Sequence, residues 1–346
     1  MRVLILMSIW LAVLPGQAQE SHSLKLTPMD IRTDSEDFYL PGIGQLETDG
    51  KHIYLREANL TEILVLDQSG TLVHSIGGKG GHPSEFGSVG VLALGIDGDW
   101  LWAIDTERKR VRGFLEGDFQ FSFLLDSFNP LFAMPTSNVF AASSSQVVVP
   151  AHPQTGHLAA VYDYSGTLVR FAGELLPFGG DLSMAIPGIN DSFWLRDGER
   201  WLSIHKYFPL ITVYSQDFEV LRELRIAGAI IDPLHEKIQA FKADKHMKTA
   251  PPLFTDAKLF GGQLFLMSSG HLHQVELSKG KVLSITRFRG EGPGFAQVTR
   301  PWVTMFFFVI LDNGTAVLAH PAMPWGHDLW TARLPFLAAN GTVRSE

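Results

Sequence analysis

The chain of 346 residues has a formal net charge of −8, from 28 lysines and arginines against 36 aspartates and glutamates. The basic residues are scattered rather than clustered, so the charge pattern excludes a nucleic-acid-binding protein. With 45% hydrophobic and 18% charged residues, the chain is expected to fold rather than to stay disordered. It has no cysteine, which excludes disulfides and a lipid-anchored cysteine.

The first elements of the chain are typical of an export signal. A basic start and an apolar stretch over residues 3–14 are followed by the small residues Gly16 and Ala18. The apolar stretch is shorter than the about twenty residues that cross a bilayer, so no membrane span is expected. We therefore predict a signal peptide over residues 1–18 and a single domain over 19–346. Without disulfides, the bacterial periplasm or the exterior of the cell is the expected location.

Two later segments, VLDQSGTLVHSIGG (65–78) and VYDYSGTLVRFAGE (161–174), share an apolar-x-Asp-x-Ser-Gly-Thr-Leu-Val pattern. This pattern is typical of a strand, a tight turn whose glycine takes a positive φ, and a second strand. Degenerate copies place the corresponding positions at 67, 114, 163, 215 and 277, with spacings of 47, 49, 52 and 62 residues. A weak sixth copy is LAANGTV (337–343). The chain therefore contains a repeat of about fifty residues.

Each repeat also carries an earlier pair of strands joined by a turn. The segments that indicate these pairs are 49–57, 97–105, 143–152, 190–197, 260–269 and 312–320. Six units of four strands predict an all-β fold, a six-bladed β-propeller of four-stranded antiparallel blades. Because an open seam would expose strand edges, residues 23–27 or the C-terminal residues 340–346 are expected to pair with blade six.

The longest spacing predicts one short helical insertion between blades four and five, over about 232–250. Asp232 can cap this helix, and Leu234, Ile238 and Phe241 recur on one of its faces. It is expected to lie over or beside the mouth of the channel. There it would act either as a cap on an inter-blade groove or as a moving lid.

The segments GGKGGHPSEF (77–86) and LALGIDGDWLWAIDTERKRVRGF (92–114) resemble the NHL repeat, whose pattern opens with G-x-G-P-G-E-F. The matching residues are Glu85, Phe86, Asp97, Gly98, Trp102, Asp105, Thr106, Arg110, Val111 and Phe114. One blade carries this resemblance well, and the first and sixth carry it in part. The resemblance implies that the glycine-rich stretch links one blade to the next, and its spacing does not match a phosphate-binding P-loop.

Candidate site residues follow from the propeller architecture, in which the loops after the second strands gather around the central channel. The predicted ligand-binding residues in or near these loops are Arg56, Glu57, Asp105, Arg196, Asp197, Trp201, His205 and Trp325. His152 and His320 also end second strands, each is followed by proline, and both are candidate ligands of calcium or zinc. By the resemblance, Asp105 and Asp197 can instead serve the fold.

Other aromatic residues extend the set. Trp102, Trp201 and Trp325 are candidate surface aromatics for a partner. His271 and His273 share one strand face, where a solvated position is expected.

Two functions remain open at this stage. The first is a binding module, a monomer whose channel mouth holds a protein, peptide or carbohydrate ligand. The second is a metal-dependent hydrolase or lyase, since some similar six-bladed propellers are calcium- or zinc-dependent lactonases and lyases. No G-x-S-x-G and no H-E-x-x-H is present. We favour the binding module because no catalytic motif stands out.

Overall fold

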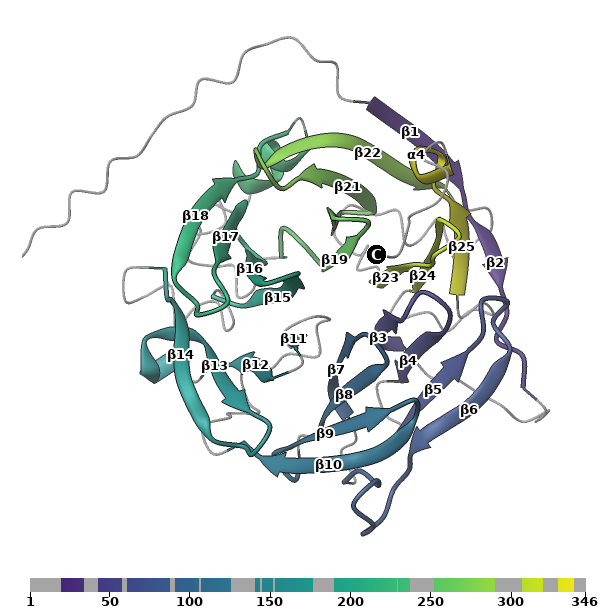
Figure 1. Cartoon of the computed structure of the whole chain (residues 1–346). Coiled ribbons are helices and arrows are strands. Elements are labelled where there is room, and N and C mark those ends of the chain that lie inside the picture. Colours follow the sequence, from purple (N-terminus) through teal and green to yellow (C-terminus); the bar gives the residue numbers. More distant parts are fainter. Residues whose placement is uncertain are drawn as a thin grey trace, which may run out of the picture.

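The computed structural model describes residues 20–33, 43–57, 61–87, 91–105, 107–125, 141–143, 145–151, 153–176, 190–228, 230–236, 252–289, 307–319 and 329–338. These residues form six β-sheets arranged as the blades of a propeller around a central axis (Figure 1). The prediction of a six-bladed, nearly all-β propeller is therefore confirmed. Within the described residues, no helix is long and apolar enough to cross a membrane.

The strands of each blade follow one another from the axis outwards. Blade one has β3 (Ile43–Thr48), β4 (Ile53–Glu57), β5 (Glu62–Leu66) and β6 (Leu72–Gly77). Blade two has β7 (Val91–Asp97), β8 (Trp100–Asp105), β9 (Arg110–Leu115) and β10 (Asp118–Leu124). Blade three has β11 (Ala141–Ala142), β12 (Gln146–Pro150), the short 3-10 turn η1 (Pro153–Thr155), β13 (His157–Asp163) and β14 (Leu168–Glu174).

The second half of the ring repeats this arrangement. Blade four has β15 (Ser192–Asp197), β16 (Arg200–His205), β17 (Leu210–Tyr214) and β18 (Val220–Arg225). Blade five has β19 (Asp256–Phe260), β20 (Gln263–Ser268), β21 (His271–Glu276) and β22 (Lys281–Arg289). Blade six has β23 (Phe307–Ile310), β24 (Thr315–Ala319) and β25 (Leu329–Arg333). The innermost strands contact their neighbours in order, and β23 contacts β3 to close the ring.

The apolar core is divided among the six interfaces between blades, with one cluster of buried side chains at each. Both faces of an inner strand can therefore be buried, and the sequence of β23 is a continuous apolar run. In β23, Phe307 and Val309 pack toward blade one, while Phe308 and Ile310 pack toward blade five. Alternate residues of a strand point to opposite faces, so one run of four residues serves two interfaces.

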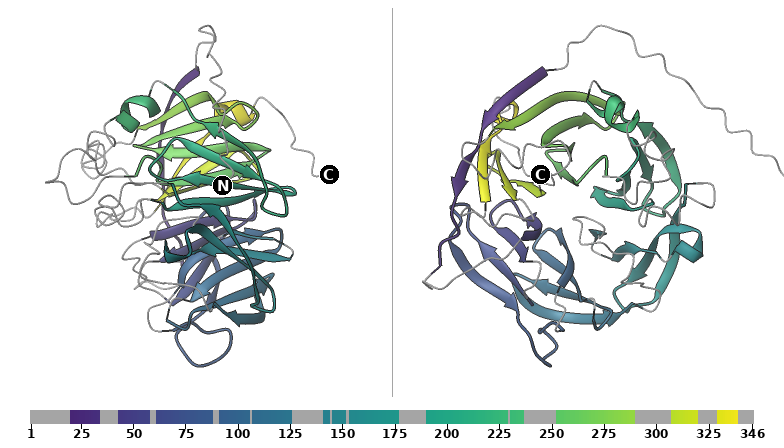
Figure 2. Two further views of the ribbon diagram at one scale, coloured as in Figure 1. Left: turned by 90° about the vertical axis from the view of Figure 1, so that its left-hand side faces the viewer. Right: turned by 180° about the vertical axis from the view of Figure 1, so that it is seen from behind.

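The ring is closed by the N-terminal residues 20–33, which we call the strap. Its strand β1 (Glu20–Lys25) pairs in parallel with β22 of blade five, and β2 (Thr27–Met29) pairs antiparallel with β25 as the fourth strand of blade six. A further bridge joins Arg32 to Thr71 of blade one. Figure 2 shows the strap running along the outside of the ring across these blades.

The seam prediction is confirmed for Thr27, which pairs with Thr331 of blade six, whereas Ser23 pairs with Arg287 of blade five. The prediction that residues 337–343 form a sixth copy of the repeat, with a turn between two strands, was wrong. The first two of these residues lie in the short helix α4 (Pro335–Ala338). The outer strand of blade six comes from the strap instead. Residues 339–346 lie outside the described residues.

The helical insertion begins where it was predicted, with helical residues 231–236 between β18 and β19. Ile231 is buried in the cluster between blades four and five, and Leu234 packs against that cluster. The Asp232 carboxylate accepts a hydrogen bond from the backbone N–H of Gly228 at 3.1 Å. These contacts favour a cap on the inter-blade groove. Ile238 and Phe241 lie outside the described residues.

Candidate functional site

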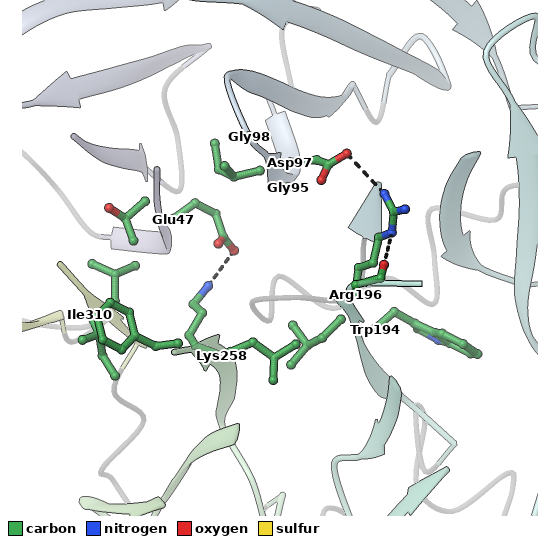
Figure 3. A pocket seen from close by; sticks show the side chains of 15 residues that line it. Glu47, Gly95, Asp97, Gly98, Trp194, Arg196, Lys258 and Ile310 are labelled. Carbon is green, nitrogen blue, oxygen red and sulfur yellow. Dashed lines mark hydrogen bonds and ion pairs between the residues drawn. The ribbon is translucent and has the colours of Figure 1, made fainter. Parts of the chain in front are cut away.

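A cavity of about 500 Å³ lies on the axis of the ring, where the innermost strands end and turn into the second strands (Figure 3). Five blades contribute to its wall through β3, β7, β15, β19 and β23. Its charged residues are Glu47, Asp97, Arg196 and Lys258. The turn residues Gly98 and Gly198 are exposed and line it too, so the cavity reaches the surface at these turns.

The alternation of the inner strands explains how charged side chains reach the axis. In β3, Leu46 packs into the core between blades six and one, while its neighbours Gln45 and Glu47 point to the other side. In β19, Ala257 packs into the core between blades four and five, while Asp256 and Lys258 lie on the opposite face. Glu47 and Lys258, near the ends of their strands, line the cavity, whereas Gln45 and Asp256 are buried against the backbone of the next blade.

Lys258 and Glu47 form an ion pair across the channel, with 2.6 Å between Nζ and Oε1. Lys258 Nζ also donates to the carbonyl oxygen of Leu46 at 2.9 Å. Glu47 Oε1 accepts a second hydrogen bond from Gln45 Nε2 at 2.8 Å. The side chains of Lys258 and Glu47 are only 10% and 12% exposed, so this pair is closed and its hydrogen-bonding groups are well satisfied.

Asp256 lies behind this pair and is fully buried. Its Oδ2 accepts a hydrogen bond from the backbone N–H of Phe308 at 2.8 Å, and Oδ1 lies 4.0 Å from Lys258 Nζ. Burial raises the pKa of Asp256 to about 6, although Lys258 and the backbone donors pull it down. The carboxylate thus ties blade five to blade six at the cost of desolvation.

Asp97 and Arg196 form a second pair across the cavity, between blades two and four (Figure 3). Arg196 Nη1 and Asp97 Oδ2 are 3.6 Å apart, and the two side chains are 26% and 32% exposed. Arg196 Nε donates to the carbonyl oxygen of Gly198 at 2.8 Å, and the guanidinium lies 5.9 Å from the ring centre of Trp201. Partial burial raises the pKa of Asp97, and Arg196 opposes that shift. This pair is more open than the first.

Several predicted residues lie at the opposite end of the blades from the cavity. Arg56 is buried, and its guanidinium donates to the carbonyl oxygens of Val91 at 3.2 Å and Gly44 at 2.8 Å. It thereby ties blade one to blade two. Glu57 ends β4, as expected.

Asp105 ends β8 as predicted and organises the glycine-rich loop. It is fully buried, with Oδ2 2.8 Å from Arg112 Nη1 and 3.0 Å from the donating backbone N–H of Gly87. Arg112 Nε in turn donates to the carbonyl oxygen of Pro83 at 2.9 Å. Gly77 has φ of +94°, and a Cβ there would lie 2.2 Å from the ring of Phe86. The glycine-rich loop therefore packs closely against the end of β6, as expected for a segment that links blade one to blade two.

The prediction that Arg196 and Asp197 end a second strand was wrong. They lie at the end of the innermost strand β15, and the second strand of blade four is β16, which ends at His205. Arg196 therefore lines the cavity, at the other end of the channel from the predicted mouth. Asp197 does not line the cavity and pairs with Arg200.

The prediction of surface aromatics was wrong for Trp102 and Trp201, which are 0% and 1% exposed. Trp201 stacks on Phe218 with 5.2 Å between ring centres. His273 was expected to be solvated, but it is fully buried, and neither of its ring nitrogens has a hydrogen-bond partner among the described residues. Burial lowers the pKa of His273 to about 3.

His205 and the residue after it form a buried polar group at the far end of the channel. His205 is 1% exposed, and burial lowers its pKa to about 4. Lys206 is 2% exposed, with Nζ 3.8 Å from Asp191 Oδ2, and burial lowers its pKa to about 8. Burial raises the pKa of Asp191.

His152, His320 and Trp325 lie outside the described residues, so their predicted roles stay predictions. Among the residues that the structure describes, no group of three histidine, aspartate or glutamate side chains could hold a metal ion.

The residues that the sequence interpretation missed are Glu47, Asp97, Lys258 and Asp256. One signal could have revealed them: each is a charged residue in an innermost strand, with Glu47, Asp97 and Lys258 close to its turn and Asp256 at its start.

No protein-family model and no curated protein matches the sequence. Among solved structures, the chain is similar to a Bacteroides fragilis protein inferred to be exported, with a TM-score of 0.55 and 11% identity over 87% of this chain and 88% of that one. It is also similar to a catalytically inactive virginiamycin B lyase of Staphylococcus aureus solved with quinupristin, with a TM-score of 0.50 and 11% identity over 90% and 99% of the two chains. At such identities these likenesses show the propeller fold alone.

Proposed function

We propose that this chain is an exported, NHL-like β-propeller that acts as a binding module and holds a small polar ligand in its axial cavity. The observation that carries the proposal is the cavity itself, which combines about 500 Å³ of space with two ion pairs on a wall that also carries apolar side chains. Small-molecule sites in proteins are concave and mostly apolar, with a few placed polar groups. The axial cavity is concave, and its placed charged groups lie beside apolar lining residues such as Leu259 and Ile310.

The arrangement supports binding more directly than catalysis. Each of the four charged side chains has an oppositely charged neighbour, at 2.6 Å in the Lys258–Glu47 pair and at 3.6 Å in the more open Arg196–Asp97 pair, so none is held as an isolated acid, base or nucleophile. Export is supported by the signal-like residues 1–18. A protein, peptide or carbohydrate partner at the opposite mouth, around Glu57, remains part of the proposal.

A metal-dependent hydrolase or lyase is the second proposal, and it rests on His152 and His320 as ligands of calcium or zinc. Elemental analysis of the purified, undialysed protein tests it. Stoichiometric zinc or calcium that is lost in the His152→Ala/His320→Ala double variant would favour the enzyme. A metal content that this double variant leaves unchanged would overturn the assignment.

The binding proposal is tested by ligand-observed NMR on the purified protein. The panel contains neutral sugars, carboxylic acids, amines and amino acids, one class at a time. Leu195→Trp and Leu259→Trp fill the cavity, because both leucines line it and are only partly buried. Leu221→Trp is the matched control, because Leu221 is 55% exposed on the outer strand β18.

We expect at least one class to bind the wild-type protein and the control but neither cavity-filling variant. If no class binds, or if the cavity-filling variants bind as well as the wild type, the axial cavity is not the binding site.

A further inference from the structure

We infer that the ligand of the axial cavity is a free α-amino acid with an apolar side chain, whose carboxylate binds Arg196 and whose ammonium group binds Asp97. This inference rests on the proposed function of the cavity and names the chemical class of its ligand.

The first step of the argument is that the Asp97–Arg196 pair is not closed. The 3.6 Å between Nη1 and Oδ2 exceeds the 2.7–3.2 Å or so of an N–H···O hydrogen bond. No described residue donates a hydrogen bond to the Asp97 carboxylate, and the side chains of Asp97 and Arg196 keep 32% and 26% of their surface exposed. Both charged groups therefore retain hydrogen-bonding capacity at the cavity wall.

The second step is that Arg196 is held in place without its terminal nitrogens. Its Nε donates to the carbonyl oxygen of Gly198, and the guanidinium lies near the ring of Trp201. The terminal nitrogens of a guanidinium form a planar fork that matches a carboxylate. A fixed fork that lacks a close acceptor is a preorganised site for an anion of that shape.

The third step is the contrast with the other ion pair of the cavity. Lys258 and Glu47 are 2.6 Å apart, and each makes a further hydrogen bond, to Leu46 and from Gln45. A ligand that displaced them would lose more hydrogen bonds than it made. The Asp97–Arg196 pair is therefore the one that would bind the charged groups of the ligand.

The fourth step is the match between the pair and the ligand. In an α-amino acid, the amino nitrogen and the carboxyl carbon are bonded to one carbon, each about 1.5 Å from it. The two opposite charges are thus side by side, as the carboxylate of Asp97 and the guanidinium of Arg196 are in the wall of the cavity (Figure 3). An inserted zwitterion would replace one long contact by two charge-assisted hydrogen-bonded pairs.

The rest of the wall indicates the side chain. Ile96, Leu195, Leu259 and Phe260 line the cavity; each packs against an inter-blade cluster, and the part of it that stays exposed offers apolar surface to a ligand. An apolar side chain would gain from its transfer out of water onto this surface. The desolvation that raises the pKa of Asp97 would also be offset by a bound ammonium group.

The test is isothermal titration calorimetry with three probes: L-leucine, N-acetyl-L-leucine, which lacks the ammonium group, and L-leucinamide, which lacks the carboxylate. We expect leucine to bind the wild-type protein and each derivative to bind at least about tenfold more weakly. Arg196→Met and Asp97→Asn should each weaken leucine binding by about tenfold or more. Arg200→Met is the matched control, because Arg200 pairs with Asp197 and does not line the cavity.

A further comparison keeps the test decisive if Arg196→Met does not fold. Asp97→Asn should lose affinity for leucine while its affinity for N-acetyl-L-leucine stays as in the wild type, since that probe has no ammonium group. Leucine binding that survives both substitutions would overturn the inference. If leucine does not bind while another class binds in a cavity-dependent way, the inference fails and the proposed function stands; if nothing binds in the cavity, both fail.

Discussion

Lys258 of blade five and Glu47 of blade one are joined across the axis of the propeller, with 2.6 Å between Nζ and Oε1. They are 211 positions apart in the chain, and blade six separates their blades in the ring. The nearby Asp256 gives the lysine a second anionic neighbour at 4.0 Å. The pair therefore connects two blades that share no interface.

Replacing Lys258 by methionine should destabilise the fold. The change leaves the carboxylates of Glu47 and Asp256 in a largely buried place without their cation, and removing one partner of a buried pair costs about 3–5 kcal/mol. Urea unfolding followed by circular dichroism measures the loss. Lys279→Met is the matched control, because Lys279 pairs with Glu276 at the surface and should leave the stability almost unchanged. Equal stabilities for the two variants would show that the pair is dispensable.

Asp256 should make the stability of the protein depend on pH. Burial raises its pKa in the folded state to about 6, above its ordinary value of 3.8. Between these values the folded state holds the proton more tightly than the unfolded state, so the contribution of Asp256 to stability increases as the pH falls from 7 toward 4.

The measurement that isolates this contribution is the difference in unfolding free energy between the wild type and Asp256→Asn, taken from pH 7 to pH 4. We expect the difference to shift in favour of the wild type as the pH falls. Asp118→Asn is the control, because Asp118 is exposed on the outer strand β10. A difference that stays constant over this range would contradict the prediction.

The blades were predictable because their turns are specified locally. The turn between the third and fourth strands needs a glycine with positive φ, and Gly70 and Gly166 have φ of +86° and +85°. Blade four was misassigned by one strand because it carries two turn signals, at Asn190-Asp191 and at Asp197-Gly198. Both sites have turn-forming residues, so the local sequence does not show which of them joins the first and second strands of the blade.

The charged pairs of the cavity could not be predicted from local patterns. Glu47 and Lys258 meet only because six blades close into a ring of a particular width. The sequence shows each of them as a charged residue inside an apolar strand, but their pairing depends on the number of blades and on how the seam is closed. The same holds for Asp97 and Arg196.

Asp105 should prove essential for the loop that joins blades one and two. Asp105→Asn leaves the Arg112 guanidinium buried beside a neutral group, with an expected loss of about 3–5 kcal/mol. Backbone amides of residues 78–87 should then exchange faster with deuterium, because Arg112 also donates to the carbonyl of Pro83. Asp99→Asn, at an exposed turn, is the control. If both variants protect the loop equally, Asp105 does not organise it.

The strap should control the closure of the ring through Leu26, which lies between β1 and β2. Leu26 is 2% exposed in the cluster between blades five and six, and its backbone N–H donates to the carbonyl of Arg289 at 2.7 Å. Leu26→Ala should cost about 2–5 kcal/mol, because it removes buried methyl groups where the strap passes from one blade to the next.

Differential scanning calorimetry measures this effect, and Glu20→Ala at the exposed start of β1 is the control. Deleting residues 20–33 should have a larger effect, because β25 loses its outer neighbour and presents an unpaired edge. Since such an edge can pair with another chain, the deletion variant should also self-associate in light scattering. A deletion variant that melts at the wild-type temperature and stays monomeric would show that the ring closes without the strap.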